Sequence, residues 1–254
     1  MDIIQPVPFY CGTSNVVLPV KNKEYFPLEF KNRSRLAYYG SLFNSVEINS
    51  SFYKIPQPKT IARWAEEVPP GFRFTFKLWK AITHEKAMSF SQADLIRFIE
   101  SISEARDRMG AVLVQFPPSL GANIPALIHL LGSIRERNAS SDWDVAVEFR
   151  NSTWYNENIY RILEDHRTAV VLHDMPASKP PLFDVPVPFI YLRFHGPDGN
   201  YRSSYDDAFL HEYAAYIRDW NENQKQVYCY FNNTMGDAVR NLQRLKFYVD
   251  HGTE

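Results

Sequence analysis

Short apolar segments alternate with amphipathic segments along the whole chain. Eight of the apolar segments are rich in β-branched and aromatic residues and are bounded by proline, glycine, asparagine or aspartate, which is typical of β-strands. They lie at residues 7–13, 43–48, 72–78, 111–116, 143–149, 168–173, 189–195 and 226–231. Segments with apolar residues at helical spacing fall between them, and the clearest of these predicts a helix over 91–109.

Capping and breaking residues set further helix boundaries. Pro58 opens a helix that Pro69 and Pro70 close, Ser204 begins another, and Thr234 begins the last. The crossover at 174–188 is rich in proline and predicts a loop with little helix.

The alternation of strands and helices predicts a parallel sheet. At 254 residues, closure into a (β/α)8 barrel is favoured over an open doubly wound sheet, because only Gly12 stands where a glycine-rich turn would follow the first strand. There is no linker, repeat or low-complexity tract, so we expect one TIM-type barrel domain over residues 1–254.

Polar and apolar residues also alternate inside the strands. In the segment 72–78, Arg73, Thr75 and Lys77 lie on one face and the apolar residues on the other. The same alternation places polar or ionisable side chains on the lumen side, at the C-terminal ends of the strands, where barrels of this kind hold their active sites. These residues are Glu47, Asn49, Lys77, Gln115, Glu148, Arg150, His173, Arg193, His195 and Asn232.

Ionisable groups in a lumen are costly to desolvate unless they are paired. The polar layer therefore has to be satisfied internally, by water or by a ligand. A purely structural interpretation is that Glu47 and Lys77, on neighbouring strands, neutralise each other.

Composition excludes some classes of protein. The net charge of −1 and the lack of a basic stripe argue against nucleic-acid binding. No segment is long and apolar enough to cross a membrane. The first residues lack a signal peptide, and the two cysteines, Cys11 and Cys229, fit a reducing compartment, so we expect a cytoplasmic protein. The oligomeric state is left open.

Six motifs run in order along nearly the full chain and together resemble the domain-of-unknown-function 72 family. They are VEINSSFY at 46–53, FRFTFK at 72–77 with ITH at 82–84, LVQFPP at 113–118, VEFRNSTW at 147–154, YLRFHG at 191–196 and YFNNT at 230–234. The resemblance implies a TIM-type barrel and no established reaction.

One segment departs from the family pattern. Family members usually open with a Gly-Thr-Ser-Gly-Trp-like turn, whereas this chain has Gly12 to Val16 with asparagine and valine at the last two positions. We therefore expect the first βα loop to bind differently from that of relatives, or to bind less.

The leading hypothesis is an enzyme, a hydrolase or lyase, that acts on a small polar anionic metabolite such as a sugar phosphate or a glycoside-like compound. Forked guanidinium donors suit phosphate or carboxylate groups, carboxylates and imidazoles suit acid–base chemistry, and amides suit hydroxyls or an oxyanion. The expected catalytic residues are Glu47, Lys77, Glu148, His173 and His195. The expected substrate-binding residues are Asn49, Tyr53, Gln115, Arg150, Arg193 and Asn232.

Other chemistries stay open. A Schiff base on Lys77 is disfavoured, because it needs a lysine of lowered pKa and a neighbouring Glu47 would favour the charged form. A divalent-metal-dependent hydrolase would draw its ligands from Glu148, His173, Asp174 and His195, although nearby arginines would repel the cation. A non-catalytic anion-binding or sensor protein would use the same arginines. There is no organic cofactor motif, and a divalent metal remains possible.

Overall fold

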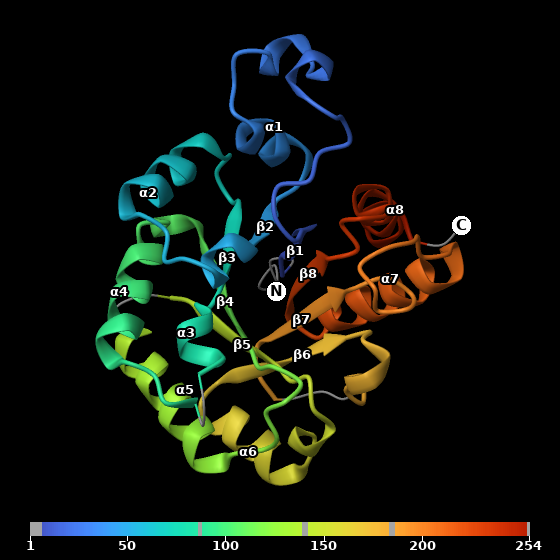
Figure 1. The fold of residues 1–254 in the computed structure, drawn as a ribbon. Helices are drawn as coiled ribbons and strands as arrows, with labels where there is room; N and C mark the ends of the chain where they lie inside the picture. The colour runs from blue at the N-terminus through green and yellow to red at the C-terminus, as the bar shows by residue number, and fades with distance from the viewer. Residues whose placement is uncertain (1–6, 86–87, 139–141, 183–185, 253–254) are drawn as a thin grey trace, which may run out of the picture.

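Eight parallel strands form a nearly closed barrel (Figure 1). The computed structural model describes residues 7–85, 88–138, 142–182 and 186–252. The strands are β1 (Phe9–Thr13), β2 (Ser45–Ile48), β3 (Arg73–Lys77), β4 (Met109–Gln115), β5 (Asp144–Glu148), β6 (Thr168–His173), β7 (Phe189–Phe194) and β8 (Gln226–Phe231). Their order is β1-β8-β7-β6-β5-β4-β3-β2. Every predicted strand is confirmed, with ends that differ by no more than two residues.

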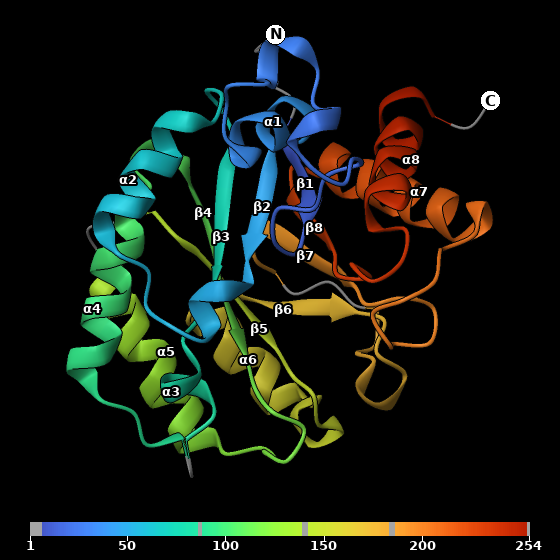
Figure 2. The ribbon, with the colours of Figure 1, turned by 45° about the horizontal axis from the view of Figure 1, so that its top comes forward.

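Helices surround the strands, as Figure 2 shows from a second direction. They are α1 (Arg35–Leu42), α2 (Pro58–Glu67), α3 (Lys80–Thr83), α4 (Gln92–Ser103), α5 (Ile124–Asn138), α6 (Glu157–Asp165), α7 (Asp207–Glu222) and α8 (Ala238–His251). Short 3-10 turns include η1 (Lys23–Tyr25), η2 (Leu28–Phe30), η3 (Asn49–Phe52), η5 (Arg106–Arg108), η6 (Ser152–Trp154) and η7 (Pro176–Ser178). In the described part of the chain, no helix is long and apolar enough to span a membrane.

Some predicted helix boundaries are wrong. The helix expected over 91–109 ends at Ser103, because the chain turns through η5, where Arg106 has a positive φ of 54°, and then enters β4 at Met109. The helix expected from Ser204 begins after Asp206, whose side chain accepts from Phe209 N. The last helix begins at Ala238 and not at Thr234. The proline-rich crossover has only η7 as helix within its described residues, as predicted; residues 183–185 lie outside them.

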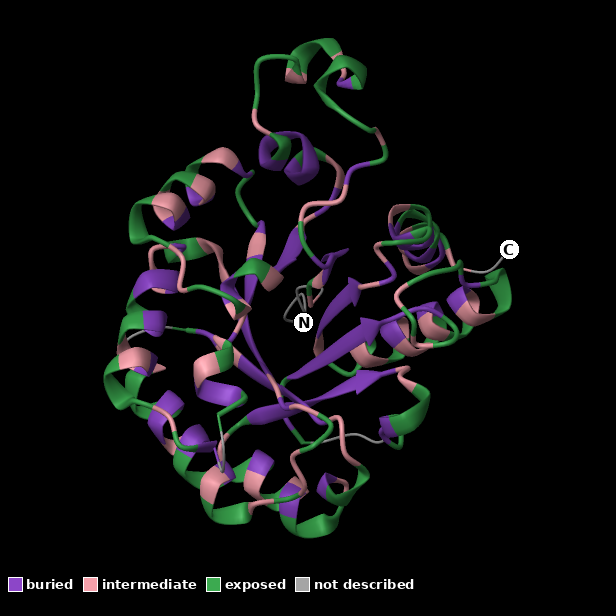
Figure 3. Ribbon diagram, viewed as in Figure 1, coloured by how far each residue is buried: buried purple, intermediate pink, exposed green. Residues whose placement is uncertain are grey.

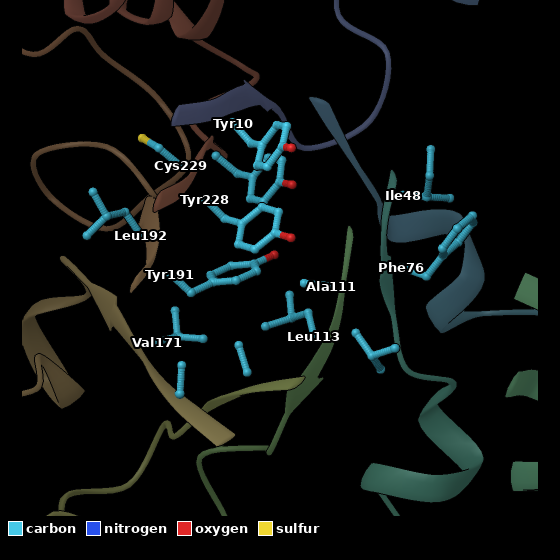
Figure 4. Close-up of a cluster of buried hydrophobic side chains, with 14 of the residues drawn as sticks. Tyr10, Ile48, Phe76, Ala111, Leu113, Val171, Tyr191, Leu192, Tyr228 and Cys229 are labelled. Carbon is cyan, nitrogen blue, oxygen red and sulfur yellow. The ribbon is translucent and has the colours of Figure 1, made fainter. Parts of the chain in front are cut away.

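The predicted alternation of faces is confirmed. Phe74 and Phe76 of β3 belong to the buried hydrophobic core, whereas Thr75 between them contacts the Tyr230 hydroxyl across the lumen at 2.7 Å. Tyr10, Tyr228 and Tyr191 form a column of rings inside the barrel (Figure 4). Figure 3 shows that the strands are buried almost throughout and that exposed residues gather on the outer faces of the helices. The lumen is therefore a packed interior whose polar atoms have to find partners within it.

Side chains close the barrel between β1 and β2. The amide of Asn44 stands in for a missing strand residue: its Oδ1 accepts from Cys11 N and its Nδ2 donates to Phe9 O, both at 2.8 Å. We call this junction between β1 and β2 the seam. Main-chain hydrogen bonding between the two segments resumes only above it, where Asn15 N donates to Glu47 O at 2.7 Å. The seam thus fixes the height of Glu47 relative to the first loop.

Tyr39 of α1 holds the middle of this seam. Its hydroxyl accepts from Thr13 N at 2.7 Å and donates to Ser45 O at 3.0 Å. The two strands approach so closely here that a Cβ on Gly12 would lie 2.0 Å from Ser45 O, so a side chain at this position would displace the backbone.

We predict that Tyr39→Phe destabilises the protein by about 2–4 kcal/mol, because it leaves a buried N–H and a buried C=O without partners. Urea unfolding followed by circular dichroism measures the change. Tyr38→Phe is the matched control, since Tyr38 is also buried but its hydroxyl has no hydrogen bond within the described residues. Equal stability of the two variants would refute a bridging role for Tyr39.

Candidate active site

A single guanidinium joins two carboxylates at the C-terminal mouth of the barrel. Arg193 of β7 contacts Glu47 of β2 with two hydrogen bonds, Nε to Oε2 at 2.9 Å and Nη2 to Oε1 at 2.8 Å. Its Nη1 donates to Glu148 Oε2 of β5. We call Glu47, Arg193 and Glu148 the charged layer. Their side chains are 0–1% exposed, so these charged groups are shielded from solvent below the mouth.

Glu47 is fully satisfied. In addition to the two bonds from Arg193, it accepts from Ser14 Oγ at 2.6 Å and from the Tyr191 hydroxyl at 2.7 Å. Burial by itself raises the pKa of Glu47, but the charge and hydrogen bonds of Arg193 outweigh it and hold the pKa below its usual value. Glu47 therefore stays ionised at neutral pH.

Glu148 is paired twice. It accepts from Arg193 and from Arg150 Nε, which lies just above it. Burial raises its pKa, but the two arginines prevail and keep the pKa well below the usual value. The two carboxylates and two guanidiniums sum to zero charge, which is the condition under which so buried a cluster is tolerated.

One ring nitrogen of His195 accepts hydrogen bonds from both guanidinium groups. Its Nε2 accepts from Arg150 Nη2 at 2.9 Å and from Arg193 Nη1 at 3.2 Å. This arrangement requires the proton on Nδ1, which faces Asp174 Oδ1 at 3.2 Å. Burial lowers the pKa of His195 against the opposing effect of its hydrogen bond to Asp174, so the imidazole is neutral. Asp174 also accepts from the Tyr205 hydroxyl.

His173 is held by the main chain. Its Nε2 contacts Phe149 O at 3.0 Å, and its Nδ1 accepts from Met175 N at 3.2 Å. Burial lowers its pKa to about 4. Both nitrogens are used in joining the tops of β5 and β6, so the geometry makes His173 a positioning residue.

Lys77 does not pair with Glu47, which corrects the structural interpretation of the sequence. Within the described residues its Nζ has no ion pair, and it lies over the Phe52 ring at 4.3 Å from the centroid. Burial and then the charge of Arg193 lower the pKa of Lys77 to about 8, against the pull of Glu148 and Glu47. Glu47 favours the charged form of Lys77, as the sequence indicated, but burial and the charge of Arg193 outweigh it, so the expectation that the pKa of Lys77 is not lowered is wrong.

The side-chain amides at the mouth have fewer hydrogen bonds than the side chains of the charged layer. Asn49 Oδ1 is buried and has no hydrogen-bond partner among the residues that the structure describes. Gln115 Nε2 donates to the neighbouring Phe116 O at 2.6 Å, and the Asn232 side chain has no hydrogen bond within the described residues. Tyr53 is 69% exposed on the loop after β2, outside the buried layer.

The structure corrects the role expected for Arg193 as a clamp for a free anion. Its donors already serve Glu47, Glu148 and His195, and its side chain is 1% exposed. Arg150 keeps Nη1 without a partner in the described part of the chain, and its side chain is 8% exposed.

The residues proposed as metal ligands do not form a ligand set. No group of three or more His, Cys, Asp or Glu side chains among the described residues is placed to hold a metal ion. The reason lies in their existing bonds: both His173 nitrogens face the main chain, Glu148 is taken by arginines, and Asp174 holds His195.

Sequence reasoning missed several residues that build the site. Tyr191 lies two residues before Arg193 in β7, so the alternation of faces was the available signal for its bond to Glu47. Ser14 and Phe52 lie in loops, where alternation carries no information. The partnership of Asp174 with His195 depends on the path of the chain after β6.

We predict that Arg193→Leu costs about 3–5 kcal/mol at pH 7, because it leaves the buried carboxylate of Glu47 without a cation and that of Glu148 with Arg150 alone. In the wild type the lowered pKa values give stability that is present above the ordinary carboxyl range and lost as pH falls through the lowered values. In the variant both carboxyls protonate more readily, so the difference should shrink at pH 4.5. Urea titrations at both pH values measure it.

Arg244→Leu provides the control for this prediction. Arg244 also makes a two-pronged contact with a carboxylate, that of Asp207, but both side chains are more than half exposed. We expect a much smaller loss with little pH dependence. If both variants lose the same stability, the charged layer is not held as described.

The sequence matches a family without an assigned activity. The family model described as "Protein of unknown function DUF72" matches residues 10–253. The UPF0759 protein YunF of Bacillus subtilis (strain 168) is 23% identical over 262 residues, covering 89% of this chain and 90% of that protein. The UPF0759 protein YecE of Escherichia coli (strain K12) is 31% identical over 121 residues, covering 47% of this chain and 43% of that protein.

Solved structures share the fold. A DUF72 family protein from Enterococcus faecalis V583 superposes with a TM-score of 0.77 at 23% identity, covering 97% of each chain. One from Thermotoga maritima MSB8 gives 0.77 at 24% identity, covering 96% of this chain and 99% of its own. A D-psicose 3-epimerase gives 0.61 at 11% identity over 94% and 98% of the chains, which is a likeness of fold alone. As the motifs indicated, this chain belongs to the DUF72 family of TIM-barrel proteins.

Proposed function

We propose that this protein is an enzyme that acts on a small, polar, anionic metabolite by general acid–base chemistry at the C-terminal mouth of its barrel. The observation that carries the proposal is the state of Lys77. Its amine is half-buried beside the charged layer, has no ion pair within the described residues, and has a pKa lowered to about 8. A base is most effective when its pKa lies near the working pH.

The charged layer supports this role without taking part in proton transfer. Its carboxylates are ionised, buried and bonded to arginines, so they have neither the accessibility nor the pKa of an acid or base near neutral pH. After burial, the charge of Arg193 is the largest cause of the lowered pKa of Lys77. Burial and then the charge of Arg193 therefore keep a fraction of the amine neutral, against the opposing effect of Glu148 and Glu47.

Groups around Lys77 suit a substrate with an anion and hydroxyls. The partner-free Nη1 of Arg150 can donate to a phosphate or carboxylate, and Lys77 adds attraction while protonated. Asn49 Oδ1 is buried without a partner and suits a substrate hydroxyl. Gln115 at the end of β4 and Asn232 directly after β8 offer further amide donors.

Among the reactions expected from the sequence, this geometry favours a lyase over a glycoside hydrolase. Glycosidases place two carboxyl groups on either side of the scissile bond. Here the Arg193 guanidinium occupies the space between Glu47 and Glu148 and bonds to both. A lyase needs one base that removes a proton from the substrate and an anchor for its anion, which Lys77 and Arg150 provide.

We also propose a reducing compartment such as the cytoplasm. Cys11 and Cys229 are register partners on adjacent strands, yet both are free thiols.

The test begins with a thermal-shift screen of sugar phosphates, hydroxy acids and other small anions, followed by turnover assays on stabilising compounds. We predict that Lys77→Met lowers kcat/KM at least about 100-fold. Because the neutral amine is the active form, wild-type kcat/KM should rise about tenfold per pH unit below pH 8 and level off above it.

Lys80→Met is the control. Lys80 is exposed and lies over Tyr53, three residues along from Lys77, and its replacement should leave kcat/KM and its pH profile unchanged. Full turnover in Lys77→Met would reject the proposal. Compounds that bind at the mouth but are never turned over by the wild type would favour the anion-sensor alternative.

A further inference from the structure

A cavity lies beside the active-site mouth and does not include the residues of the charged layer. It has a volume of about 620 Å³ and lies between the segment that joins β1 to α1 and the helix α2. Its apolar lining comes from Val16, Leu36, Ile48 and Trp64. In Figure 1 the β1–α1 segment runs out beyond the ring of helices before it returns into α1, so this wall of the cavity is built by an excursion from the barrel.

The cavity is large enough for a drug-sized ligand, since pockets of that kind usually measure about 300–1,000 Å³. Leu36 and Ile48 are buried core residues, and Trp64 is half-buried and lines the cavity, so part of its indole is accessible to an occupant. A half-open indole beside aliphatic groups favours a flat ring, which recovers contact area and stacking energy together.

The rim of the cavity is positively charged. Lys23, Arg35 and Arg63 line it, against one carboxylate, Glu67. Glu67 is already engaged, because one oxygen accepts from Ser34 Oγ at 2.6 Å and the other lies 3.7 Å from Arg63. Lys23 and Arg35 have no ion pair within the described residues. Two uncompensated cations at the edge of an apolar cavity select an anion.

The cavity touches the wall of the active site. Asn15, which lines it, accepts a hydrogen bond from Asn49 N at 3.1 Å through Oδ1, and Ser50 lines it next to Asn49. Asn15 has a positive φ of 62°, a conformation that asparagine tolerates better than most residues. This turn sends Val16 away from the mouth, where it forms part of the cavity wall.

We propose that this cavity is a binding site for an aromatic anion, a flat ring that carries a phosphate or carboxylate. The ring lies against Trp64 and Val16, and the anion faces Lys23 and Arg35. The site goes beyond the proposed function, because binding here requires no reaction at Lys77. The first βα loop departs from the family pattern at Asn15 and Val16, and in this proposal both residues line the binding site of the aromatic anion.

The experiment uses 1-naphthyl phosphate as the probe in isothermal titration calorimetry. The two halves of the probe, 1-naphthol and inorganic phosphate, are titrated separately. We expect 1-naphthyl phosphate to bind with a Kd of about 1 mM or below, at least tenfold tighter than either half. Val16→Trp fills the cavity, and Arg35→Gln removes a rim cation; each should weaken binding at least tenfold.

Controls separate this site from the mouth. Leu28→Trp adds the same bulk in the same segment at a residue that is 86% exposed and outside the cavity, and it should leave the Kd unchanged. Arg33→Gln is the corresponding control for charge. Lys77→Met should also leave the Kd unchanged, so the result does not depend on the proposed function.

Three results would overturn the proposal. The first is no binding of 1-naphthyl phosphate to the wild type. The second is binding that survives both Val16→Trp and Arg35→Gln. The third is binding lost in Lys77→Met and kept in Arg35→Gln, which would place the probe at the mouth. Arg35 is exposed, so its variant tests the site even if Val16→Trp fails to fold.

Discussion

The placement of one guanidinium between two carboxylates determines the rest of this structure. Arg193 is buried with Glu47 and Glu148, and each ion is tolerated in the lumen only because the others are present. The remaining polar atoms of the upper lumen are arranged around this charged layer. Ser14 and Tyr191 donate the remaining hydrogen bonds to Glu47, and Arg150 is the second cation bound to Glu148. A neutral His195 accepts hydrogen bonds from both arginines.

The geometry of the barrel keeps this arrangement in register. Glu47 lies at the top of β2, and β2 is joined to β1 by the side chains of Asn44 and Tyr39 instead of a strand ladder. A shift at this seam would move Glu47 away from Arg193, which is held by β7 on the far side of the lumen. In the proposed function the chemistry belongs to the amine of Lys77, and burial together with the charge of Arg193 lowers the pKa of that amine.

The fold could be predicted from the sequence almost completely, whereas the site could be predicted only as a set of residues. Alternation along each strand placed Glu47, Glu148 and Arg193 in the lumen because the direction of a strand side chain depends only on its position. Pairing across the lumen depends on the relative heights of strands far apart in sequence, so Arg193 rather than Lys77 takes Glu47. Helix ends were misjudged at Ser103, after which the chain turns at the positive φ of Arg106, and at Ala238, before which the main chain bonds to the loop after β7. The loop contributions of Ser14, Phe52 and Asn15 had no local signal.

The most direct test of the central claim is a carbon-13 NMR titration of the side-chain carboxyls of glutamate, with Glu47 and Glu148 assigned from their glutamine variants. Both resonances should remain those of ionised carboxylates between pH 8 and the usual range for glutamate and titrate below it. A resonance of either residue that titrates between pH 6 and pH 8 would contradict it, since that carboxyl would then be a proton donor at neutral pH and not a fixed charge held by Arg193.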